Sequence, residues 1–117
     1  MGDGHAAQGD GEVCLTAIEA SMSGTFQLIV RKDLKITMPR AETATHYIAL
    51  GLNEDLDEAA RQALRQMIAW IGELSGLPAI DAYTLCSLAA DLRISQVVDV
   101  NKGVHCMLPK SALPPRQ

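Results

Sequence analysis

The chain has 117 residues, of which 48% are apolar and 21% charged, and its formal net charge is -4 at pH 7. This balance is that of an ordinary globular domain, so it excludes disordered, collagen-like and low-complexity chains. A mildly acidic chain with only 3% aromatic residues lacks the basic surface of a nucleic-acid-binding protein, and it contains no apolar run of the roughly 20 residues that span a membrane.

Targeting and redox signals are sparse in this sequence. The first 12 residues contain no basic region followed by an apolar stretch, so we predict no secretory signal. Cys14, Cys86 and Cys106 form no Cys-x-x-Cys pair, which indicates reduced, structural thiols. We therefore expect a soluble cytoplasmic protein that binds neither nucleic acid nor membranes, with one domain over residues 1–117.

The N-terminal segment 1–12 is rich in glycine and in polar side chains, which predicts a loop. It carries His5, Asp10 and Glu12 with glycines between them. Glycine lets the backbone turn tightly enough for an imidazole and carboxylates to converge on one metal ion or one water. The spacing alone favours the simpler alternative, a solvated loop, because Gly-Asp-Gly turns are common.

Apolar and polar residues alternate through much of the segment 13–50, which predicts β-strands. We expect strands at 13–18, 25–31, 36–38 and 45–50, with the first two paired. Both faces of the first strand are apolar, so we expect it to be covered on both sides.

Residues 53–76 change to a helical period, with apolar residues recurring at steps of three and four. Asp55 with Glu58 three residues later resembles a capping box, and Gly76 supplies a stop signal. A second helix is expected over about 78–90, because proline is accepted in a first turn.

The remaining elements are strands at 94–100 and 104–108, joined by a hairpin loop at 101–103, and a Pro-rich tail at 109–117. This order predicts an α+β fold, an antiparallel β-sheet with two helices packed on one face. Two helices cover only one face of a sheet. The other face is therefore expected to mediate oligomerisation or to belong to a larger fold of which this chain is a part.

Three isolated polar residues have simple structural interpretations. Glu19 and Glu42 lie at strand ends, where a carboxylate can act as a general base, but an ion pair with Arg31 or Arg40 is the simpler interpretation. His46 shares a face with apolar residues and is expected to be a core histidine with a satisfied ring nitrogen.

Longer motifs also occur. Residues 2–14 are GDGHAAQGDGEVC and residues 16–19 are TAIE. Shorter motifs follow along the rest of the chain: Glu42-Thr43, His46-Tyr47, Asp55 to Ala59, Asp81 to Tyr83, Cys86-Ser87, Asp91 to Ile94, Val98-Asp99, Asn101 to His105 and Leu108-Pro109. Together they resemble the acetamidase/formamidase family over residues 2 to about 111.

The resemblance implies hydrolysis of short linear amides, formamide and acetamide, to a carboxylic acid and ammonia. It also implies a cytoplasmic homo-oligomer with a jelly-roll-like β-rich part and an α+β part. The motif lies well inside the much longer family chains, so this chain is similar to their C-terminal portion and is expected to need the N-terminal half. The alternative is a non-catalytic remnant, a small-ligand or metal-binding module that oligomerises through an uncovered sheet face.

The resemblance also gives roles to the polar residues of the N-terminal loop. His5 and Asp3 are expected to bind a metal, Glu12 to act as general base or further ligand, and Asp10 to orient His5. The second-rank catalytic candidates are Glu19 and His105. Amide hydrolysis without an obvious Ser or Cys triad calls for carbonyl polarisation by a divalent metal, zinc or calcium. No nucleotide or organic cofactor is expected, because the sequence contains no P-loop or dinucleotide-binding fingerprint.

Overall fold

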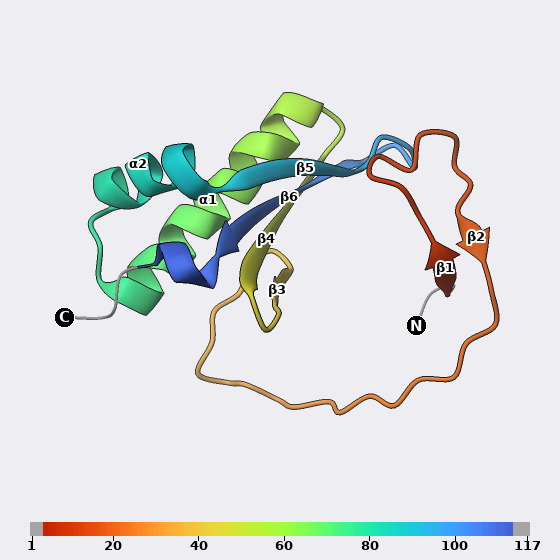
Figure 1. Cartoon of the computed structure of the whole chain (residues 1–117), viewed down its shortest axis with the longest axis horizontal. Coiled ribbons are helices and arrows are strands. Elements are labelled where there is room, and N and C mark those ends of the chain that lie inside the picture. Colours follow the sequence, from red (N-terminus) through yellow and green to blue (C-terminus); the bar gives the residue numbers. More distant parts are fainter. Residues whose placement is uncertain (1–3, 114–117) are drawn as a thin grey trace.

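The computed structural model describes residues 4–113, which form a four-stranded antiparallel sheet, two helices and a separate two-stranded ladder (Figure 1). The sheet has the strand order β3-β4-β6-β5, and the ladder pairs β1 with β2. The strands are β1 (His5–Ala7), β2 (Ile18–Glu19), β3 (Arg40–Glu42), β4 (His46–Asn53), β5 (Asp91–Gln96) and β6 (Lys102–Pro109). The helices are α1 (Leu56–Ser75), α2 (Ala79–Ala89) and a 3-10 turn at Lys110–Ala112.

Both predicted helices are confirmed, and the signals at the ends of α1 act as expected. The side chain of Asp55 accepts a hydrogen bond of 2.8 Å from the backbone N–H of Glu58, which satisfies a donor that the first turn leaves free. Gly76 ends α1 in the left-handed conformation, with φ of 79°, and its N–H donates to the carbonyl of Gly72.

The core lies between α1 and the central strands β4 and β6. Alternate residues of β6, Val104, Cys106 and Leu108, face the helices and are buried, and Ala49 is buried beside them on β4. The buried residues of α1 are Ala59, Ala63, Met67, Trp70 and Ile71. No charged or polar residue of the described part of the chain is buried. The predicted α+β fold, with both helices on one face of an antiparallel sheet, is therefore confirmed (Figure 1).

No helix within residues 4–113 covers the opposite face of the sheet (Figure 1). The strand alternation directs Ile48 and Leu50 of β4, and His105 and Met107 of β6, toward this face, where all four are half-buried. This arrangement matters for the site, because His105 and its neighbours lie on the side of the sheet away from the core.

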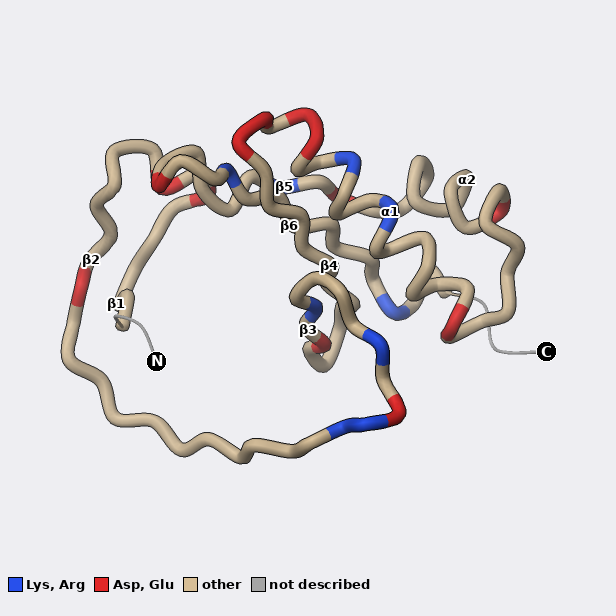
Figure 2. The backbone as a smooth tube through the Cα atoms, turned by 180° about the vertical axis from the view of Figure 1, so that it is seen from behind, with Lys and Arg blue, Asp and Glu red and all other residues tan. Residues whose placement is uncertain are grey.

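The strands predicted at 13–18, 25–31 and 36–38 are wrong. Residues 13–17 form turns and coil, and only Ile18 and Glu19 join a ladder. Residues 20–39 lie outside the sheet as irregular chain with a turn at 32–33. Figures 1 and 2 show this segment running in a wide arc from β2 to β3. The expected burial is also wrong, since Val13 is 76% and Leu28 94% exposed. Alternation of apolar and polar residues shows which face of a segment is apolar. A strand forms, however, only where a neighbouring strand provides backbone hydrogen-bonding partners.

The predicted C-terminal hairpin is confirmed with shifted bounds. β5 begins at Asp91, earlier than the predicted 94, and ends at Gln96, so the connection to β6 runs over 97–101. The predicted tail at 109–117 begins with the last residue of β6, followed by the 3-10 turn, and Leu113 packs against the core. Neither described helix is long and apolar enough to cross a membrane.

Candidate functional site

The ladder of β1 and β2 brings two of the predicted site residues together. His5 on β1 is the direct antiparallel partner of Glu19 on β2, and both side chains are exposed. The Glu19 carboxylate accepts a hydrogen bond of 3.1 Å from the backbone N–H of Ala17. The pKa of Glu19 is lowered from its usual value mainly by backbone N–H donors and, to a smaller extent, by the nearby His5. Glu19 is therefore held as a carboxylate beside an imidazole.

Gln8 fixes the orientation of the His5 ring. The amide nitrogen of Gln8 lies 3.2 Å from the carbonyl oxygen of Ser95, which can only accept, so this end of the amide is the donor. The amide oxygen then faces the His5 Nδ1 at 2.8 Å, and Nδ1 must carry the proton. The lone pair of His5 is left on Nε2, the atom free to bind a metal or to accept a proton.

Ser95 connects this group to His105 on the open face of the sheet. The pairing of β5 with β6 shifts between Ile94 and Gln96, so Ser95 is the extra residue of a β-bulge. Its hydroxyl oxygen lies 2.7 Å from the Nδ1 of His105, while its carbonyl accepts from Gln8. A chain of hydrogen-bonding groups therefore runs from His5 through Gln8 and Ser95 to His105.

The turn at residues 9–12 lies against the end of β5. The carbonyl of Gly11 accepts a hydrogen bond of 2.8 Å from the N–H of Val97, and the Asp10 carboxylate lies 3.7 Å from the Arg93 guanidinium. Gly11 and Glu12 both have positive φ, 95° and 41°, and this reverses the chain. Positive φ is strained for glutamate, and such strain persists where surrounding contacts hold the backbone.

Comparison with known proteins decides the family. The model of the Acetamidase/Formamidase family matches residues 1–113. The chain belongs to this family. Among solved structures it is similar to an acetamidase from Bacillus halodurans, with a TM-score of 0.82 and 33% identity over 90% of this chain. It is also similar to an acetamidase from Yersinia enterocolitica, with a TM-score of 0.81 and 34% identity over 94% of this chain.

A third solved relative is a predicted acetamidase/formamidase from Thermoanaerobacter tengcongensis, with a TM-score of 0.76, 29% identity and 93% of this chain covered. The matched region is 36%, 33% and 36% of these three relatives, so this family member spans about a third of their length. No curated protein matches it.

The structure places His5, Asp10 and His105 in three separate groups. His5 lies with Glu19, Asp10 lies with Arg93, and His105 is reached from His5 only through other side chains. A shallow hollow of about 330 Å³ beside the β1–β2 ladder is lined by Glu19 and by Gly4, Ala20 and Ser21. The expectation that His5, Asp10 and Glu12 line one pocket is not met by this hollow, and Asp3 lies outside the described residues.

The described residues of this family member supply only part of the ligand set that a metal ion needs. His5 offers Nε2 and Glu19 offers carboxylate oxygens on the neighbouring strand, but a closed metal site generally takes three or four protein ligands. Within residues 4–113, no three His, Cys, Asp or Glu side chains are grouped closely enough to hold an ion. A site with three or more ligands would therefore need at least one ligand from beyond the described residues.

Glu42 takes a structural role with a different partner from the ones expected, and His46 is not the predicted core histidine. Glu42 pairs with Lys110 at 2.5 Å, whereas Arg40 pairs with Glu73. His46 is half-buried, and its Nδ1 lies 2.8 Å from the hydroxyl of Thr45. Among the cysteines, Cys86 and Cys106 are buried as expected, but Cys14 is exposed, because the strand predicted around it does not form.

Sequence reasoning missed the connecting residues Gln8, Arg93 and Ser95. Gln8 follows His5 by three residues in a polar Gly-rich loop, so its spacing was a usable signal. Ser95 had no such signal, because the bulge that turns it toward both His105 and Gln8 is a property of the pairing between β5 and β6.

Proposed function

We propose that this chain forms part of a hydrolase of short linear amides, acting on formamide or acetamide to give a carboxylic acid and ammonia. Membership of the acetamidase/formamidase family supports this proposal. Because the chain spans about a third of its solved relatives, we also propose that turnover needs the N-terminal portion of the family fold. A cytoplasmic location fits the three free cysteines.

The hydrogen-bond network that links His5 to His105 through Gln8 and Ser95 is the observation that best supports this proposal. With Nδ1 held by Gln8, the Nε2 of His5 is positioned to bind a metal or to take up a proton. Glu19 beside it stays ionised and can hold a positive charge that develops on His5. His105 is linked to the same group through Ser95 and is a second proton acceptor on the open face of the sheet.

Glu12 is the proposed general base for the attacking water. The turn holds it in place, since the carbonyl of Gly11, immediately before it, accepts a hydrogen bond from Val97, the residue after β5. Asp10, paired with Arg93, positions this turn rather than His5. A zinc or calcium ion bound by His5, Glu12 and Asp3 would supply polarisation of the amide carbonyl.

The test is ammonia release from formamide and acetamide. The chain is assayed alone and together with the N-terminal two-thirds of a solved relative, cut at the start of the matched region. We expect slight or no activity alone and clear activity when the N-terminal part is supplied. His5→Ala and Glu12→Gln should each lower turnover at least about a hundredfold, the scale of a lost acid–base group.

Glu42→Gln is the matched control, because Glu42, at the end of β3, forms a partly exposed ion pair with Lys110 of the 3-10 turn. It should change turnover by much less than either site variant. Full activity in both the His5 and the Glu12 variants would refute the site assignment. Robust hydrolysis by the chain alone would refute the need for the N-terminal portion.

A second function, a non-catalytic module that self-associates, is favoured by one observation. Large apolar side chains along residues 13–36 are exposed, among them Phe26 at 64%, Leu28 at 94% and Val30 at 83%. Exposed apolar surface on this scale is typical of an interface. A complemented chain that binds acetamide but releases no ammonia would support this second function.

A further inference from the structure

A pocket of about 270 Å³ lies between α1, α2 and the β5–β6 side of the sheet, apart from the loop at residues 8–12. Its walls include Leu64 of α1, Tyr83 of α2 and Leu92 of β5. Tyr83 and Leu92 are each about half exposed, at 53% and 50%, and form the rim. Cys86 and Cys106 also line the pocket and are 4% and 0% exposed, so they form its floor.

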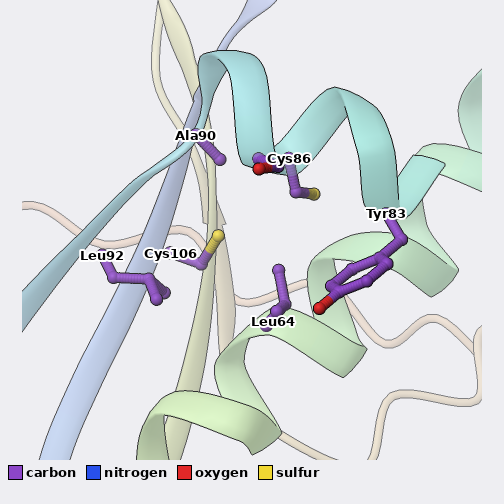
Figure 3. Close-up of a pocket in the computed structure, with 7 residues that line it drawn as sticks. Leu64, Tyr83, Cys86, Ala90, Leu92 and Cys106 are labelled. Atoms are coloured by element: carbon purple, nitrogen blue, oxygen red, sulfur yellow. The ribbon is translucent and has the colours of Figure 1, made fainter. Parts of the chain in front are cut away.

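The two cysteines come from different elements but face the same space. Figure 3 shows the sulfur of Cys86, on α2, and the sulfur of Cys106, on β6, both directed into the pocket. Hydrogen bonding with the neighbouring Cys106 side chain lowers the pKa of Cys86. The same pairing, together with burial, raises the pKa of Cys106. Of the two, Cys86 therefore ionises first and Cys106 keeps its proton.

The surroundings favour a neutral product over a bound cation. Within the described residues these two sulfurs belong to no cluster of three or more potential metal ligands. Two thiolates around a monovalent ion would leave a net negative charge in a largely apolar pocket, and burying an uncompensated charge is costly. A disulfide carries no charge. The catalytic roles proposed above use neither cysteine.

We propose that Cys86 and Cys106 form a modification site at which a hydroperoxide oxidises the two thiols to an intramolecular disulfide joining α2 to β6. A small hydroperoxide can enter through the rim at Tyr83 and Leu92. The site is independent of amide hydrolysis, since it lies on the helix-covered side of the sheet and His105 on the other.

The reaction balances with the peroxide as the only oxidant. The Cys86 thiolate attacks one peroxide oxygen, the O–O bond breaks, and the released hydroxide takes up the proton lost by Cys86, leaving a sulfenic acid. The Cys106 sulfur then attacks the Cys86 sulfur, an S–S bond forms, the S–O bond breaks, and the oxygen leaves as water with the Cys106 proton. Two thiols and one hydrogen peroxide give one disulfide and two waters.

The bond would close a loop that contains β5 and would hold α2 against the sheet. Of the residues of α2, only Ala82 and Cys86 are buried, so this helix has few other anchors. A disulfide restricts the unfolded chain, so we expect oxidation to raise the thermal unfolding midpoint by about 5 °C or more.

The experiment treats the folded Cys14→Ser chain with hydrogen peroxide, blocks free thiols by alkylation, and maps tryptic peptides without reduction. Trypsin separates the three cysteines of the natural chain into peptides 1–31, 66–93 and 103–110. We expect peptides 66–93 and 103–110 to be linked within one molecule, so that the denatured, unreduced chain has the covalent mass of a monomer. Both cysteines recovered as alkylated thiols, or separately as sulfinic acids, would overturn the proposal, and so would a link between two molecules.

Two controls keep the result specific. In the natural chain, peptide 1–31 should stay outside the linked pair, because Cys14 is exposed and lies on the loop before β2. After oxidation in denaturant, all three pairings should occur. The same pattern of links from folded and denatured chains would contradict a site built by the fold. The unmutated chain supplies this comparison even if a cysteine variant fails to fold.

Discussion

Gly51 shows how one residue sets the distance between a helix and the sheet. It lies near the end of β4, where the backbone of α1 comes very close to the strand. A Cβ at this position would overlap the backbone oxygen of Ala59 and lie 2.5 Å from the backbone nitrogen of Ala63. Ala59 and Ala63 are themselves fully buried, so the contact is backbone against backbone, with small residues on both sides.

We expect Gly51→Ala to lower the free energy of unfolding by at least about 2 kcal/mol, because neither backbone can move away without displacing the core. Gly9→Ala is the matched control, since a Cβ there meets nothing within 4 Å, and it should change stability by less than about 0.5 kcal/mol. Urea unfolding of the three chains is the measurement. Equal midpoints for Gly51→Ala and the unmutated chain would contradict the close approach.

At the scale of the element, α1 is stabilised by charges in its first turns. Asp57 and Glu58 are acidic residues near the positive end of the helix dipole. Glu58 also lies 2.7 Å from the guanidinium of Arg65 and 3.5 Å from that of Arg61. Arg65 first, and Arg61 to a smaller extent, lower the pKa of Glu58 below its usual value of 4.5.

This lowered pKa predicts a pH dependence of stability. A carboxyl with a lower pKa in the folded chain stabilises the fold above its unfolded pKa, and this contribution is lost as the pH falls through the folded pKa. Glu58→Gln should therefore lower the thermal midpoint slightly at pH 7, and the difference should shrink as the pH falls below about 4. Glu54→Gln, at an exposed position just before the helix, is the control. A difference that stays constant from pH 7 to pH 3 would be incompatible with this ion pair.

At the scale of the whole molecule, the arc at residues 20–39 dominates the shape. The radius of gyration is 15.5 Å, whereas a compact chain of this length is expected at about 13 Å. The arc departs from the body in both Figures 1 and 2 and carries exposed apolar side chains. The chain therefore presents apolar surface that its own core does not cover.

We predict that the chain self-associates or precipitates at micromolar concentration, because this surface is accessible to other copies. Leu28→Ser with Val30→Ser should reduce association and leave the thermal midpoint unchanged within about 1 °C, since neither side chain is buried. Light scattering after size-exclusion chromatography measures association. A clean monomer of the unmutated chain at micromolar concentration would contradict the prediction.

The sequence by itself determined the helical part of this protein and its family. The bounds of α1 follow from a local cap at Asp55, a periodic apolar stripe and a glycine stop, all within one segment. The N-terminal motif identified the family and gave His5 and Glu19 as candidates, because a motif is recognised from the residue types and their order along the chain.

Only the tertiary structure decided which strands exist and what the candidates touch. The alternation at 25–31 is as regular as that at 45–50, yet only the latter finds an edge, on β6. Likewise, the link from His5 to His105 depends on a bulge at Ser95, which arises from the pairing of two strands. Capping and helical period act over a few residues, whereas strand pairing and bulges depend on partners far away in the chain, and no local pattern specifies them.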